Sequence, residues 1–180
     1  MKVIAIVGMA GAGKSEVAKV FEEHGFKKVR FGDITDEELK NKGLEQNEEN
    51  EHYVRQQLRK KHGMPAYAKL NLPRIDSSLK SSDVVVDGLY SWEEYILLKE
   101  RYGRRLITVA VWASPATRHA RLARRAERPL TLEEAASRDK SEIENINKGG
   151  PIAMADFAIV NKDSLEELRR ETERVLSALK

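Results

Sequence analysis

Hydrophobic residues cluster in five short runs along the chain, and polar segments with helical periodicity separate the runs. The runs cover residues 3–7, 28–31, 82–88, 106–112 and 155–161. Each is short and bounded by polar or glycine-containing turns, which is typical of buried strands. Because the strands alternate with helices, the pattern predicts an α/β fold in which helices cover both faces of a five-stranded, doubly wound parallel sheet.

Composition and charge narrow the class of protein. The length of 180 residues fits one domain, and the net charge of +3 gives no reason to expect nucleic acid as an obligate partner. The absence of cysteine excludes disulfides and a thiolate nucleophile. The chain starts directly with a strand and lacks an apolar run of the ~20 residues that cross a bilayer, so we expect a soluble cytoplasmic protein without a membrane partner. Either a monomer or a homo-oligomer is compatible with this composition.

A glycine-rich loop follows the first run. Residues 8–15 read G-M-A-G-A-G-K-S, which matches G-x-x-x-x-G-K-S between a predicted strand and a predicted helix. The glycines let the backbone curl with its N–H groups inward, and the helix N-terminus favours an anion. Lys14 would reach the terminal phosphates of ATP or GTP, and Ser15 would give one oxygen to Mg²⁺. The predicted phosphate-binding residues are Gly8, Gly11, Ala12, Gly13, Lys14 and Ser15.

Two aspartates follow predicted strands, at the end of the sheet where α/β folds bind ligands. Asp33 comes after the second run, beside the glycine-rich loop, and Thr35 with Glu38 would form a capping box there, so Asp33 is free for function. Asp87 follows three consecutive valines and is predicted to hold a water of Mg²⁺. A plain Asp-Gly turn is the alternative for Asp87.

An arginine cluster follows the fourth run. Its members are Arg118, Arg121, Arg124, Arg125 and Arg128, five guanidiniums within eleven residues. Such a cluster repels itself unless an anion lies between its members, and guanidinium groups match phosphate oxygens in geometry. We therefore predict that residues 118–138 form a lid over the glycine-rich loop. The alternative is a solvated basic helix that touches nucleic acid.

Residues 36–80 read as polar helices inserted between two strands, with Pro73 kinking the last one. In a phosphotransferase such an insertion would hold the phosphate acceptor. Arg55, Arg59 and Arg74 are the candidate contacts, and solvated surface arginines are the alternative.

These features together resemble the P-loop nucleotide and nucleoside monophosphate kinases, and most closely their dephospho-CoA kinase-like branch. The marks of the resemblance are the loop at 8–15, Asp33, and the segments 86–88, 121–125 and 155–161. The resemblance implies a P-loop kinase fold and transfer of the γ-phosphoryl group of ATP or GTP, with Mg²⁺, to a small nucleotide-like acceptor.

The resemblance also implies roles for single residues. Lys14, Arg121 and Arg125 would act on the transferring phosphoryl group, and Asp33 would take the proton of a hydroxyl acceptor. The two arginines and Asn161 would also bind the nucleotide. The segment N-K-D-S at 161–164 is similar to a guanine-reading N-K-x-D, but its aspartate comes one residue early and fits better as a helix cap. The donor base therefore stays open between adenine and guanine.

Two other functions remain in view. A nucleoside monophosphate kinase of the adenylate type is less favoured, because its Asp-Gly is usually followed by a phosphate-gripping arginine and here Leu89 and Tyr90 follow. A nucleotide-dependent switch or RNA-associated ATPase is suggested by the basic helix alone.

Overall fold

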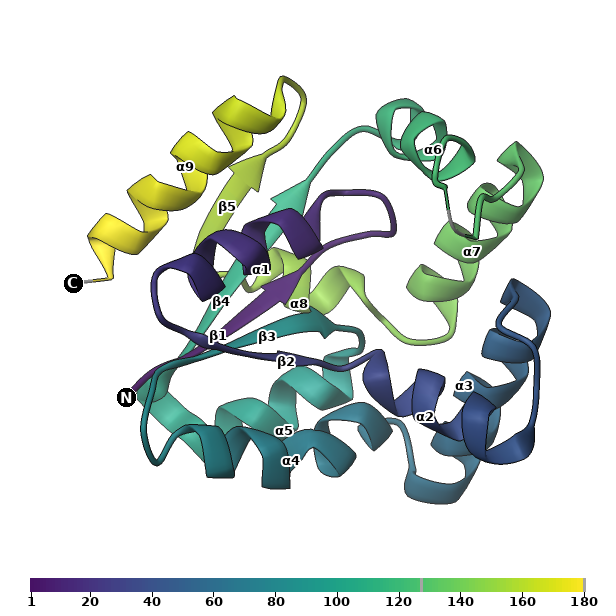
Figure 1. Ribbon diagram of the computed structural model, residues 1–180, viewed down its shortest axis with the longest axis horizontal. Helices are drawn as coiled ribbons and strands as arrows, with labels where there is room; N and C mark the ends of the chain where they lie inside the picture. Colours follow the sequence, from purple (N-terminus) through teal and green to yellow (C-terminus); the bar gives the residue numbers. More distant parts are fainter. Residues whose placement is uncertain (127, 180) are drawn as a thin grey trace.

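The computed structural model describes residues 1–126 and 128–179, and its centre is a five-stranded parallel sheet (Figure 1). The strand order is β2-β3-β1-β4-β5. The strands are β1 (Val3–Val7), β2 (Lys27–Arg30), β3 (Val84–Leu89), β4 (Leu106–Trp112) and β5 (Phe157–Val160). Burial accounts for the apolar runs of β1 and β3, since every residue of these two strands is buried. The predicted fold class is confirmed.

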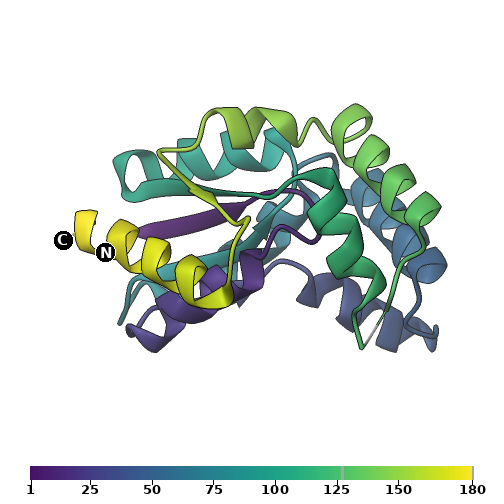
Figure 2. The same cartoon turned by 90° about the horizontal axis from the view of Figure 1, so that it is seen from above.

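Helices cover both faces of the sheet (Figures 1 and 2). The described helices are α1 (Lys14–Glu23), α2 (Asp33–Lys42), α3 (Glu48–His62), α4 (Ala66–Ser78), α5 (Trp92–Tyr102), the 3₁₀ turn η1 (Gly103–Arg105), α6 (Pro115–Ala123), α7 (Leu132–Glu144), α8 (Gly149–Ala153) and α9 (Leu165–Ala178). The strand period of two divides β1 between the layers. Ile4 and Ile6 pack with α1 and α9, whereas Val3, Ala5 and Val7 face α4 and α5.

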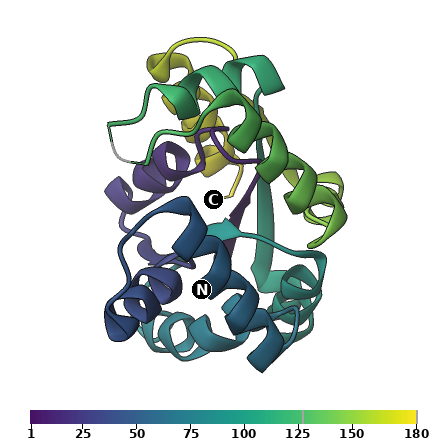
Figure 3. The same ribbon diagram turned by 90° about the vertical axis from the view of Figure 1, so that its right-hand side faces the viewer.

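The remaining helices gather at the carboxyl ends of the strands. Figure 3 looks onto this end, where α2 and α3 lie opposite α6 and α7. Local chemistry sets where several helices begin: Ser91 and Thr131 form capping boxes, and Ser114 caps α6. Within the described residues, none of the helices is both long and apolar enough to cross a membrane.

Three expectations about local structure differ from what is observed. β3 lies between β2 and β1, so Asp33 is one strand farther from the glycine-rich loop than predicted. Thr35 does not cap a helix, because α2 already begins at Asp33 and the Thr35 hydroxyl bonds to Tyr67 at 2.6 Å. Ser164, rather than Asp163, caps α9. The helical nature of residues 36–80 agrees with α2 to α4, and α4 continues through Pro73.

Candidate active site

The glycine-rich loop connects β1 to α1 with a tightly curled backbone. Gly8 and Gly13 have φ values of 150° and 104°. A Cβ on Gly8 would lie 2.3 Å from the Val111 carbonyl oxygen, and one on Gly13 would lie 2.3 Å from Nδ2 of Asn161. Neither contact is sterically possible, so only glycine lets the loop pack this closely on its neighbours. The helix N-terminus at Lys14 completes an anion-binding geometry.

A small cavity of about 110 Å³ opens directly on this loop. Its lining residues are Ala10, Gly11, Lys14, Ser15, Arg30, Asp87, Gly88, Tyr90, Arg125, Arg138, Glu142 and Lys148. The Lys14 ammonium donates to the Met9 carbonyl at 3.0 Å. Burial and then the nearby Lys148 lower the pKa of Lys14 to about 7. Burial beside a second ammonium therefore penalises the positive charge of Lys14, and an anion bound in the cavity would relieve that penalty.

Three charged side chains form the wall of this cavity opposite the loop. The Lys148 ammonium lies 2.8 Å from Oε2 of Glu142, and Nε of Arg138 lies 3.4 Å from Oε1 of the same carboxylate. Burial opposes ionisation of Glu142, but Lys148 and Arg138 outweigh it and lower the pKa of Glu142 to about 2. Glu142 is thus a carboxylate shared by two cations.

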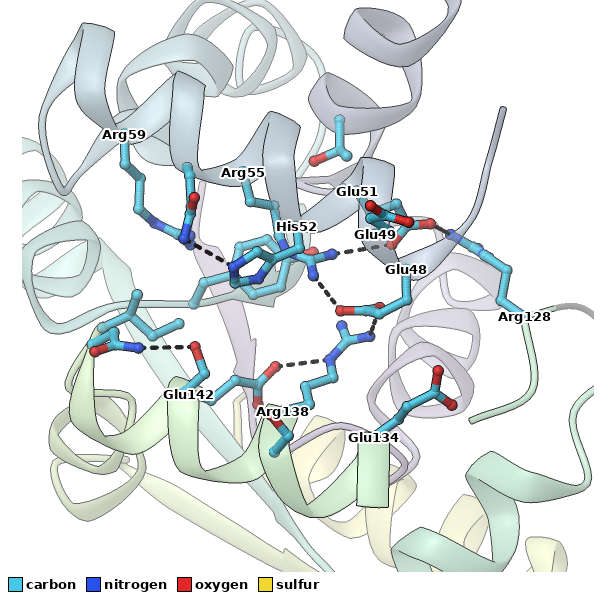
Figure 4. A pocket seen from close by; sticks show the side chains of 18 of the residues that line it. Glu48, Glu49, Glu51, His52, Arg55, Arg59, Arg128, Glu134, Arg138 and Glu142 are labelled. Atoms are coloured by element: carbon cyan, nitrogen blue, oxygen red, sulfur yellow. Dashed lines mark hydrogen bonds and ion pairs between the residues drawn. The ribbon is translucent and has the colours of Figure 1, made fainter. Parts of the chain in front are cut away.

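A larger cavity of about 990 Å³ adjoins the small one and lies between α3 and α7 (Figure 4). The two cavities share Arg30, Tyr90, Arg125, Arg138 and Glu142. The guanidinium groups on the large cavity are those of Arg30, Arg55, Arg59, Arg125, Arg128 and Arg138. Its carboxylates are those of Asp36, Glu48, Glu49, Glu51, Glu133, Glu134 and Glu142. Positive and negative groups are therefore nearly balanced along its walls.

Ion pairs join the two walls of the large cavity. Arg138 of α7 donates to Glu48 of α3 at 3.0 Å, and Arg128 reaches Glu51 at 2.5 Å. On α3 itself, Arg55 bonds to both of these glutamates. Figure 4 shows the Glu48 and Arg138 side chains meeting between the helices. Charge pairing thus connects the inserted helices to the segment predicted as a lid.

This chain is similar to known proteins over most of its length. A family model described as an AAA domain matches residues 4–147. A UPF0200 protein of Thermococcus kodakarensis is 38% identical over 181 residues, covering 98% of this chain and 97% of that protein. A UPF0200 protein of Hyperthermus butylicus is also 38% identical, over 98% of this chain and 94% of its own. The chain belongs to the UPF0200 family.

Solved structures similar to this UPF0200 protein include several kinases. Shikimate kinase from Bacteroides thetaiotaomicron superposes with a TM-score of 0.64 at 14% identity, covering 99% of this chain and 98% of its own. Dephospho-CoA kinase from Campylobacter jejuni gives a TM-score of 0.58 at 15% identity, covering 99% and 97%. At these identities the likeness shows the P-loop kinase fold, and it does not single out the dephospho-CoA kinase branch.

The predicted lid arginines of this UPF0200 protein have different surroundings. Arg118 is buried, donates to the backbone of Ala10 and Ala113, and forms a bidentate pair with Asp139 at 2.8 and 2.7 Å. Its role is therefore structural. Arg125 lines both cavities, as the prediction requires. Arg124 is exposed and lines neither.

Asn161 and Arg121 lie together behind the loop. The Asn161 amide donates to the Ala12 carbonyl at 2.8 Å, and Arg121 donates to the Asn161 side chain at 3.2 Å. One Arg121 nitrogen, Nη1, is buried without a hydrogen-bond partner among the described residues. The two residues thus brace the loop, and their predicted contacts with a nucleotide stay predictions.

The other predicted site residues divide between the cavities and the surface. Asp87 is 6% exposed and lines the small cavity with Lys14 and Ser15. Asp33 lines neither cavity, and its half-exposed carboxylate accepts from Arg30 at 2.8 Å. Arg30 lines both cavities, so it is the link between Asp33 and the site.

The predicted acceptor arginines also differ from one another. Arg55 and Arg59 line the large cavity, and the Arg59 guanidinium lies 5.3 Å from the ring centre of Tyr67. Arg74 instead pairs with Glu37 on the surface at 2.7 Å. Two of the three candidates therefore line the large cavity, and their contact with an acceptor stays a prediction.

Sequence reasoning missed four residues of the small cavity. These are Arg30, Tyr90, Glu142 and Lys148. Tyr90 had a sequence signal, because it follows Asp87-Gly88 where, by the resemblance described above, an adenylate-type kinase usually has an arginine. For the other three residues the sequence pattern indicates only local structure: Arg30 ends a strand, Glu142 lies on a helix and Lys148 lies in a turn. Their significance depends on long-range packing that the sequence does not display.

Proposed function

We propose that this UPF0200 protein is a Mg²⁺-dependent phosphotransferase that transfers the γ-phosphoryl group of ATP or GTP to a hydroxyl group of a small nucleotide-like acceptor, in the manner of dephospho-CoA kinase. The observation that carries the proposal is the adjacency of the two cavities, which share five lining residues. A triphosphate seated on the glycine-rich loop would direct its terminal phosphate at the boundary between them. An acceptor in the larger cavity would meet that phosphate there.

Each donor-site residue has a definite part in this proposal. The loop N–H groups and Lys14 bind phosphate oxygens, and Arg125 and Arg138 face the transferring group from the other wall. Ser15 and the buried Asp87 lie on the same cavity and suit a metal that keeps most of its ligands as water and phosphate. Bound there, Mg²⁺ would neutralise charge on the β- and γ-phosphates.

Two observations favour a hydroxyl acceptor over a monophosphate. Tyr90 occupies the place of the arginine that grips a monophosphate, and its ring is held by Tyr67 at 5.2 Å and by Phe31. Moreover, carboxylates already neutralise Arg55, Arg128 and Arg138, so these groups offer little extra attraction to a dianionic acceptor. A hydroxyl acceptor needs a base instead. Asp33 is the proposed base, and it would have to exchange Arg30 for the acceptor.

One observation favours the nucleoside monophosphate kinase alternative. Within the described residues, neither Arg59 nor Arg125 has a carboxylate partner, and Nε of Arg59 is buried without a hydrogen bond. These two groups are the ones in the large cavity that would gain from an anionic acceptor.

An acceptor screen tests the proposal and separates the alternatives. Purified protein with Mg²⁺ and either ATP or GTP would be offered dephospho-CoA and a panel of nucleoside monophosphates, with release of ADP or GDP as the readout. We expect acceptor-dependent turnover with the hydroxyl compound and its loss in Lys14→Ala. The control is Lys69→Met, which changes an exposed lysine. Nucleotide release that no acceptor stimulates would contradict the proposal. Asp33→Asn should reduce hydroxyl phosphorylation far more than monophosphate phosphorylation.

A further inference from the structure

Lys148 is a lysine with almost no exposed surface. It is 1% exposed and lies in the turn between α7 and α8. Lysines are almost never fully buried unless they are paired, because removing an ammonium from water is costly. The partner of Lys148 is Glu142, which also serves Arg138. Because Glu142 is shared with Arg138, it compensates the buried ammonium of Lys148 only in part. Burial lowers the pKa of Lys148, and the opposing effect of Glu142 does not cancel this.

The position of Lys148 relates it to both cavities. Its side chain lines the small cavity together with Lys14 and Asp87. The ammonium also lies 5.2 Å from the ring centre of Tyr90. Tyr90 and Glu142, the two groups it touches, line the small and the large cavity alike. Lys148 therefore stands at the boundary where the phosphate site meets the acceptor site.

The backbone around Lys148 forms a closely packed turn. Asn147, directly before it, has a φ of 52°, a left-handed conformation that asparagine adopts more readily than most residues. The Lys148 amide donates to the Glu142 carbonyl at 3.1 Å. Behind it, Gly150 packs so closely on Trp92 that a Cβ would lie 2.6 Å from the indole ring. These contacts fix the turn and direct its lysine inward.

The charges around the small cavity are unbalanced. Five basic side chains line it, those of Lys14, Arg30, Arg125, Arg138 and Lys148, against the two carboxylates of Asp87 and Glu142. In a site of low polarity such an excess is costly, and it is what a polyphosphate would neutralise. After burial, the charge of Lys148 is the largest influence that lowers the pKa of Lys14, and both lysines line the same small cavity, so the two ammonium groups can share one anion.

We infer that Lys148 is a second phosphate-binding lysine of this site, one that contacts the γ-phosphoryl group during transfer and is kept in place by Glu142 when the site is empty. The inference rests on the proposed function. In the transfer step the acceptor oxygen bonds to the γ-phosphorus as the bond to the β–γ bridging oxygen breaks. The hydroxyl proton passes to the base, proposed as Asp33, and the nucleoside diphosphate leaves with the bridging oxygen. Lys148 keeps its proton throughout and stabilises charge on the non-bridging oxygens.

Calorimetry with MgATP and MgADP tests this role without knowledge of the acceptor. We expect wild-type protein to bind ATP more tightly than ADP, because only ATP carries the phosphate that Lys148 contacts. Lys148→Met should weaken ATP binding by about tenfold or more, the usual effect of one charge-assisted hydrogen bond, while ADP binding changes by less than about twofold. Lys148→Arg keeps the charge and should recover part of the ATP preference. Lys69→Met, on the surface, is the matched control.

A purely structural role for Lys148 predicts a different result. If the lysine only compensates Glu142, Lys148→Met leaves an unpaired buried carboxylate, and the double variant Glu142→Gln with Lys148→Met relieves it. That double variant also gives a folded protein to test if the single variant melts early. An ATP preference equal to wild type in either variant overturns the inference, and its loss in both supports it. Wild-type protein that binds neither nucleotide would instead contradict the proposed function.

Discussion

Proton uptake on nucleotide binding is a direct consequence of the environment of Lys14. Burial, with Lys148 next in importance, lowers the pKa of its ammonium to about 7. The other charged groups that act on it are Arg138, which lowers the pKa further, and Glu142 and Asp87, which raise it. Phosphate oxygens bound beside Lys14 would raise this pKa again, so above pH 7 the complex holds a proton that the free protein lacks.

The sign and size of the effect follow from linkage. The bound state holds more protons above the free pKa, so nucleotide affinity falls as pH rises above 7 and is insensitive to Lys14 below it. With a free pKa of about 7, roughly nine in ten molecules lack this proton at pH 8, and affinity should fall about tenfold per pH unit above that. The terminal phosphate contributes little, because its own second pKa of about 6 lies below this range.

Calorimetry in two buffers of different ionisation enthalpy measures the uptake. At pH 8 the observed heats should differ by close to one buffer ionisation enthalpy per nucleotide bound. Lys14→Arg, whose guanidinium does not titrate, should bind with an affinity that is flat between pH 7 and 9. Lys148→Arg, by contrast, should leave most of the uptake in place. Equal heats in both buffers for the wild-type protein would refute this account of Lys14.

Three further predictions concern the framework of the site. Gly13→Ala should abolish nucleotide binding measured by calorimetry, because its Cβ would lie 2.3 Å from Asn161. Arg118→Met should lower the free energy of unfolding by about 3 kcal/mol and the melting temperature by roughly 6–12 °C, because it leaves Asp139 without its partner. Adding Asp139→Leu should recover most of this loss. If the single and the double variant melt at the same temperature, the unpaired carboxylate is not the cause of the loss. Burial raises the pKa of Glu94 to about 7, so its contribution to stability is present below pH 4.5 and lost as pH rises through 7. Glu94→Gln should remove a pH dependence of about 3 kcal/mol, seen in urea unfolding at pH 5 and 8.

The successful sequence predictions concern features that depend on interactions within one short segment of the chain. The loop at 8–15 is recognisable because its glycines and lysine act through the backbone of one short segment. The caps formed by Ser91, Ser114 and Thr131 are equally local, since each hydroxyl accepts a hydrogen bond from a backbone N–H three residues later. The central strands β1 and β3 are recognisable because burial on both faces leaves continuous apolar runs.

Long-range contacts explain where the predictions failed. Arg118 shares a helical spacing with Arg121 and Arg125, but the carboxylate of Asp139 on another helix takes Arg118 out of the site. Thr35 has the pattern of a capping residue, and packing against Tyr67 overrides it. Lys148 lies in a turn whose glycines and proline are the visible signal, while its partners are set by the fold. Residue 127, which lies in the predicted lid, is outside the described residues.

The ion pairs that join α3 to Arg128 and to Arg138 of α7 have a consequence for kinetics. Arg138 and Arg128 already form ion pairs with Glu48 and Glu51. An anionic ligand that enters between the helices would therefore replace a glutamate as the partner of an arginine. Such an exchange yields little net electrostatic attraction at long range. Capture rates in the larger cavity should therefore depend only weakly on ionic strength, and selectivity should come from shape and from departure rates instead.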